Sequence, residues 1–136
     1  MAKAEKYGYR DLRLSGRHRL YGADCPMVDI DFICCEYFSK IPKAIIEYKH
    51  IRAIKPDWTQ ANYQTLINLG EMASLPVYVT LYDPHRWKFQ VHAGNALAQK
   101  IVNNPTVLNE KRYYSFLCFL RGIEPQENIL RKLNEI

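Results

Sequence analysis

The chain has 136 residues, of which 48% are hydrophobic and 24% are charged, and its formal net charge is +5. This composition excludes a fibrous or disordered protein, and the length suits one domain, residues 1–136, around a single core. No apolar run reaches the roughly 18 residues of a membrane span, and the N-terminus lacks the apolar segment of a secretory signal. We therefore expect a cytoplasmic protein with no membrane partner.

The positive charge is concentrated in a basic arm, residues 1–22. The sequence does not decide the secondary structure of this arm, because Gly16 weakens any helix there. A cluster of cations at the start of a chain is typical of segments that bind the phosphates of nucleic acids, although a solvated surface has the same composition. The residues that we expect to contact phosphate are Arg13, Arg17, His18 and Arg19.

Two apolar runs rich in β-branched and aromatic residues follow the arm. Residues 27–37 and 44–51 favour strands. Pro42 lies between them, in a predicted turn, because proline cannot donate a hydrogen bond to a central ladder. Two strands joined by a short loop predict an antiparallel hairpin.

The core, residues 23–93, continues with a helix and a second hairpin. Asp57, followed three positions later by Gln60, predicts an N-cap with a capping-box partner, and apolar residues at helical spacing extend the helix to about Leu75. Residues 77–82 and 87–92 are strand-like and flank a turn.

Residues 94–136 are predicted to be helical. A short helix begins at Asn95, Asn109 caps a second one that Gly122 ends, and Pro125 opens a third. The order strand, strand, helix, strand, strand and helices predicts an α/β fold, a mixed β-sheet flanked by helices with a C-terminal helical extension.

Charged residues interrupt the first hairpin. Side chains alternate along a strand, so Asp29 and Asp31 share one face, and Glu47 and Lys49 share one face of the next strand. Buried carboxylates are costly unless they are paired or bind a metal, and Mg²⁺ prefers oxygen ligands. A nearby ammonium can orient or activate a metal-bound water. These residue types predict metal-dependent hydrolysis of phosphodiester bonds.

The order of Asp31, a turn, Glu47-Tyr48-Lys49 in an apolar strand, a helix and another strand resembles the PD-(D/E)XK superfamily of nucleases. The stretches CPMVDIDF, PKAIIEYKH and LPVYVTLYD are similar to small nuclease-like proteins of phages and bacteria. Pro26 departs from the family pattern, because it lies several residues before the aspartate.

The resemblance implies a restriction endonuclease-like fold and a nuclease that acts on nucleic acid in a bacterial or phage-infected cell. DNA is the expected substrate in preference to RNA. It makes Asp31, Glu47 and the main-chain carbonyl of Tyr48 ligands of Mg²⁺ or Mn²⁺, with Asp29 as the alternative carboxylate. Asp31 is preferred because its separation from Glu47 is nearer the family's usual hairpin length. Lys49 positions the attacking water. A homodimer is compatible with a chain of this size, since two active sites would serve a duplex.

Three other interpretations stay open. Glu47 and Lys49 can form an ion pair on an exposed strand, with Asp29 and Asp31 on the solvated side of the sheet. A nuclease-like protein without catalytic activity would only bind nucleic acid or another protein. The acidic pair at residues 29–31 also resembles the metal-binding motif of sugar-nucleotide glycosyltransferases, which normally need a larger nucleotide-binding domain.

Overall fold

The computed structural model of the chain describes residues 12–24, 26–52 and 57–134. Its centre is a five-stranded mixed β-sheet with the strand order β1-β2-β3-β4-β5. The strands are β1 (Phe32–Cys35), β2 (Pro42–His50), β3 (Val77–Asp83), β4 (Lys88–Ala93) and β5 (Thr106–Asn109). β2 and β3 pair in parallel, and the other neighbours pair antiparallel. The predicted α/β fold with a mixed sheet is confirmed.

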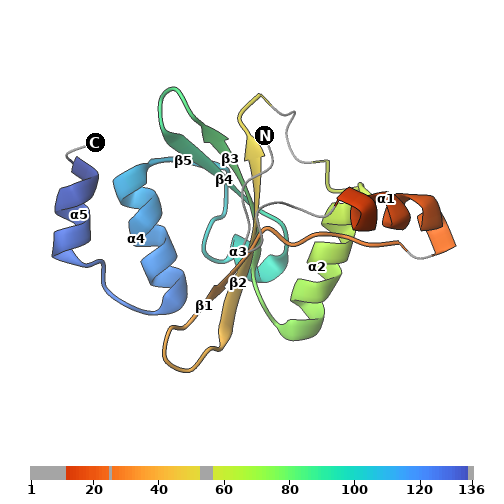
Figure 1. Cartoon of the computed structure of the whole chain (residues 1–136). Coiled ribbons are helices and arrows are strands. Elements are labelled where there is room, and N and C mark those ends of the chain that lie inside the picture. The colour runs from red at the N-terminus through yellow and green to blue at the C-terminus, as the bar shows by residue number, and fades with distance from the viewer. Residues whose placement is uncertain (1–11, 25, 53–56, 135–136) are drawn as a thin grey trace.

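Helices cover both faces of the sheet (Figure 1). α2 (Ala61–Ala73) packs on one face, and α4 (Glu110–Arg121) and α5 (Glu127–Asn134) lie on the other. The short α3 (Ala96–Gln99) follows β4 and buries Ala98 in the same core as α4. α1 (Leu12–Tyr21) and the 3₁₀ turn η1 (Gly22–Asp24) precede the sheet, on the α2 side in Figure 1. The result is three layers with the sheet in the middle.

β2 is a central strand whose side chains enter both layers. Ile45 packs with Leu66 and Val77 on the α2 face, whereas Ile46 packs in the core that α4 covers. Burial on both faces is typical of a strand with a parallel neighbour. The alternation then places Glu47 and Lys49 on the α2 face and Tyr48 on the α4 face.

The first hairpin is antiparallel, as predicted, but its strands have other limits. β1 begins only at Phe32, so the prediction that Asp29 and Asp31 lie within a strand is wrong. The ladder ends there because the Asp31 side chain, rather than a backbone carbonyl, accepts the N–H of Tyr48 at 3.0 Å. Pro42 is the first residue of β2 instead of a turn residue, an end position that proline tolerates.

The predicted N-cap of α2 is also wrong. The Oδ1 atom of Asp57 accepts hydrogen bonds from the backbone N–H of Thr59 at 3.0 Å and from its hydroxyl at 2.6 Å. Asp57 therefore closes a local turn, which competes with capping, and α2 begins after Gln60. The second hairpin, β3 and β4, is confirmed.

The C-terminal segment is not wholly helical, because it contributes the edge strand β5, which pairs with β4. The predicted caps of α4 are confirmed: Asn109 Oδ1 accepts the N–H of Arg112 at 2.8 Å, and Gly122 ends the helix with a φ of 91°. α5 begins two residues after Pro125.

Glu36 joins the tip of the first hairpin to α4. Its carboxylate accepts the N–H groups of Phe38 and Ser39, and it forms an ion pair with Arg121 at 2.9 Å. The Ser39 N–H, the Phe38 N–H and Arg121 together lower the pKa of Glu36 to about 2.

We expect Glu36→Gln to lower the melting temperature by a few degrees at neutral pH. The folded state has the lower pKa, so this stabilisation is present above the unfolded value near 4.5 and is lost as the pH falls towards 2. Thermal unfolding followed by circular dichroism checks it, with Glu124→Gln as the control on an exposed position. An equal difference between wild type and Glu36→Gln at pH 7 and pH 2 would contradict the assignment.

Candidate active site

The charged residues of the first hairpin line one cavity on the α2 face of the sheet. The cavity has a volume of about 300 Å³. Its wall consists of Met27, Val28, Asp29, Asp31, Glu47, Lys49 and Asn62. The structure therefore brings together all four charged side chains that the sequence singled out, although Asp29 and Asp31 come from the segment before β1.

The pairing of β1 with β2 brings Asp31 next to Glu47. Phe32 is paired with Ile46, so the preceding residue on one strand lies opposite the following residue on the other. The Asp31 carboxylate is held by the N–H of Tyr48 and lies within hydrogen-bonding reach of the Glu47 carboxyl. Two carboxyl groups thus share one end of the cavity.

Glu47 is the buried member of this pair, with 6% of its surface exposed. Burial, then the hydrogen bond and negative charge of Asp31, raise the pKa of Glu47 to about 8, while Lys49 opposes the shift. Without a bound cation, the pair therefore retains a proton at neutral pH. A group whose pKa is shifted this far in a cavity is typical of functional sites.

We expect the metal-free protein to lose stability relative to Glu47→Gln as the pH rises from about 4.5 to 8. In this window the unfolded chain releases the Glu47 proton and the folded chain retains it, so unfolding becomes easier. The difference should be a few kcal/mol at most, because water entering the cavity screens the pair. Urea unfolding at several pH values in EDTA measures it. A difference that does not change with pH would contradict the raised pKa.

Asn62 is the polar residue of the cavity that sequence reasoning missed. It lies in the first turn of α2 and contributes to the wall opposite the strands. Its position four residues before the buried Leu66 was the available signal, since residues so spaced share a helix face. The amide offers both a donor and an acceptor to a bound water or phosphate.

The basic residues predicted to contact phosphate lie elsewhere. Arg13, Arg17, His18 and Arg19 are on α1, and none of them lines the cavity. Three are exposed and His18 is half-buried. The rest of the arm, residues 1–11, lies outside the described residues.

The donor set suits a hard divalent cation. Within residues 12–24, 26–52 and 57–134, no group of three or more His, Cys, Asp or Glu side chains forms a ready metal site. Mg²⁺ commonly uses only one or two carboxylates and completes its shell with water and phosphate oxygens. The pair of Asp31 and Glu47 in an open cavity fits that requirement, and a cation would replace the proton that the two groups share.

Comparisons of the chain with protein-family models, with curated proteins and with solved structures find no significant match. Among the described residues, no helix has the length and apolar character needed to cross a bilayer. The function therefore has to be argued from the cavity itself.

Proposed function

We propose that this protein is a metal-dependent nuclease of the PD-(D/E)XK type that hydrolyses phosphodiester bonds, above all in DNA. One observation carries the proposal: Asp29, Asp31, Glu47 and Lys49 line a single cavity. The order β1, turn, β2, α2 and β3 supports it, because it repeats the strand, turn, strand, helix and strand of the resemblance. A surface ion pair explains less, since Glu47 is buried.

In this proposal Asp31 and Glu47 hold Mg²⁺ or Mn²⁺, with the Tyr48 carbonyl as a further ligand and Asp29 as the alternative carboxylate. When bound, the cation supplies a water of lowered pKa and stabilises charge on the phosphate. Glu47 must release its proton before it can act as a ligand, so the raised pKa favours loading at higher pH.

Lys49 shares the cavity and the strand face with Glu47. Its ammonium can hydrogen-bond the attacking water and offset negative charge that develops on the phosphate. The cations of α1 would hold the nucleic-acid backbone at a distance from the reacting bond, a contact that carries little sequence information.

The test is incubation of the purified protein with linear, nicked, branched and single-stranded nucleic acids in Mg²⁺, Mn²⁺ or EDTA. We expect cleavage of at least one DNA substrate with a divalent cation and none in EDTA. Intact substrates in every condition would overturn the proposal.

A second candidate is a catalytically inactive nuclease-like module that binds nucleic acid or a protein. The contact between Asp31 and Glu47 favours it, because a shared proton already satisfies the two carboxyl groups without a metal. Retention of nucleic acid in a gel-shift assay, combined with intact substrates in the cleavage panel, would support this module.

A further inference from the structure

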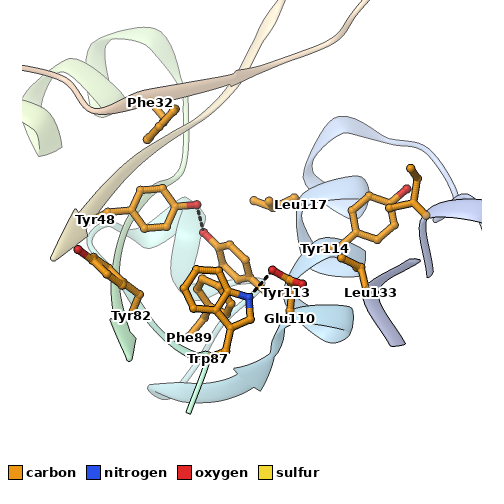
Figure 2. A pocket seen from close by; sticks show the side chains of 11 residues that line it. Phe32, Tyr48, Tyr82, Trp87, Phe89, Glu110, Tyr113, Tyr114, Leu117 and Leu133 are labelled. Atoms are coloured by element: carbon orange, nitrogen blue, oxygen red, sulfur yellow. Dashed lines mark hydrogen bonds between the residues drawn. The ribbon is translucent and has the colours of Figure 1, made fainter. Parts of the chain in front are cut away.

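A second cavity, of about 620 Å³, lies on the opposite face of the sheet, against α4 and α5 (Figure 2). Aromatic side chains from β1, β2, β3, β4 and α4, together with Trp87 of the turn before β4, form most of its wall. The Phe89 and Tyr113 rings stack with centroids 4.4 Å apart, and Trp87 meets Phe89 edge-on at 5.3 Å. The Tyr48 and Tyr113 hydroxyls are hydrogen-bonded to each other at 2.5 Å. The rings are thus fixed by contacts within the fold.

Glu110 is the only charged residue among the described residues that line this cavity. One of its oxygens, Oε2, accepts a hydrogen bond from the Trp87 indole, as Figure 2 shows. The other, Oε1, is shielded from water and has no hydrogen-bond partner. The first turn of α4 favours a carboxylate through the helix dipole, but this leaves Oε1 without a donor.

A carboxylate with one unpartnered oxygen, lying beside aromatic rings, favours a particular kind of ligand. A buried acceptor without a partner costs free energy that a nearby positive charge would recover. The faces of aromatic rings carry partial negative charge and attract cations, and aromatic sites of this kind recognise quaternary ammonium groups. The carboxylate and the rings therefore both favour the binding of a cation.

We propose that this cavity binds a small organic ammonium ion with an apolar body. Its volume is within the range of small-molecule sites, roughly 300–1,000 Å³. The apolar body would lie on Leu117 and the rings, and the cationic group would lie near Glu110. Direct contact with Oε1 is not needed, since the charge of the Glu110 carboxylate acts on a cation over several ångströms. The site is separate from the proposed nuclease centre, because Tyr48 and Glu47 point to opposite faces of β2.

The test is a titration of the full chain with benzyltrimethylammonium. Calorimetry measures the binding, and Trp87 fluorescence measures it in a Trp58→Phe variant. Trp58 packs near Tyr63 on the other face, so Trp87 would be the remaining indole. Benzyl alcohol and 3-phenylpropionate serve as the neutral and anionic probes. We expect saturable binding of the cation, about tenfold tighter than that of either other probe.

Glu110→Gln keeps the size of the side chain and removes its charge, and it should weaken binding of benzyltrimethylammonium about tenfold. Glu71→Gln, on the exposed surface of α2, is the matched control and should leave binding unchanged. Circular dichroism confirms that each variant is folded. If Glu110→Gln does not fold, the comparison of the three probes on the wild-type protein still tests the proposal. No saturable binding of the cation, equal binding of the neutral probe, or unchanged binding by folded Glu110→Gln would overturn the proposal.

Discussion

Replacing Glu47 by Gln or Lys49 by Ala should lower metal-dependent DNA cleavage by roughly 10²–10⁴-fold while changing DNA affinity little. Glu47 is the buried carboxylate of the cavity, so in the proposed mechanism its replacement removes a metal ligand that no other side chain supplies at that position. Lys49 provides the positive charge beside it. Most of the affinity should survive, because in the proposed function other residues contact the phosphate backbone.

Single-turnover cleavage in Mg²⁺ and DNA binding in EDTA separate these two effects. Glu71→Gln and Lys100→Ala are matched controls, because both positions are exposed and lie outside the cavity. Loss of cleavage and binding together would indicate an unfolded or misassigned site. Wild-type rates in both variants would show that the cavity is not catalytic. Asp29→Asn and Asp31→Asn extend the series, and we expect the larger loss from Asp31→Asn.

Asn95→Ala should produce the largest loss of stability of any polar substitution proposed in this protein, about 2–4 kcal/mol. Asn95 is buried, with 5% of its surface exposed. Its Oδ1 accepts the N–H groups of Val77 at 3.2 Å and Ala98 at 3.0 Å, and its Nδ2 donates to the carbonyl of Leu75 at 2.8 Å. One amide thus connects the end of the α2–β3 loop, the start of β3 and the first turn of α3.

Urea unfolding with a matched Asn104→Ala control, at an exposed position, measures this loss. Asn95→Asp is the informative companion, because it keeps the acceptor, removes the donor to Leu75 and buries a charge. It should also destabilise the protein. A free energy of unfolding for Asn95→Ala within about 0.5 kcal/mol of wild type would contradict the role, since that range is typical of surface substitutions.

The alternation of side chains along the second strand of the first hairpin was enough to predict one part of the candidate site. The alternation predicts that Glu47 and Lys49 share one face of β2, and the structure places both in the same cavity. The limits of β1 could not be predicted, because a side chain from Asp31 replaces the backbone as the partner of Tyr48. Such a replacement of a backbone acceptor by a side chain depends on how the two strands pack together. It leaves no recognisable pattern in the sequence of either strand.

The contacts between distant parts of the chain could not be predicted from the sequence for the same reason. β5 has only four residues and became recognisable only through its pairing with β4. The aromatic cavity combines Tyr48, Trp87 and Tyr113, which lie far apart in the chain. Each aromatic residue by itself is more simply explained as part of the core.

The order of strands in the sheet has a consequence for how the chain reaches its fold. Every strand pairs only with its neighbours in sequence, so no strand has to insert between two that are already joined. Three of the four pairings are antiparallel, and only β2 and β3 must wait for α2 to close the connection between them. Pairings between strands that are close in sequence favour fast folding, because little loop-closure entropy is lost before the contacts form. The parallel pairing that positions Glu47 beneath α2 is therefore the step that we expect to limit the folding rate.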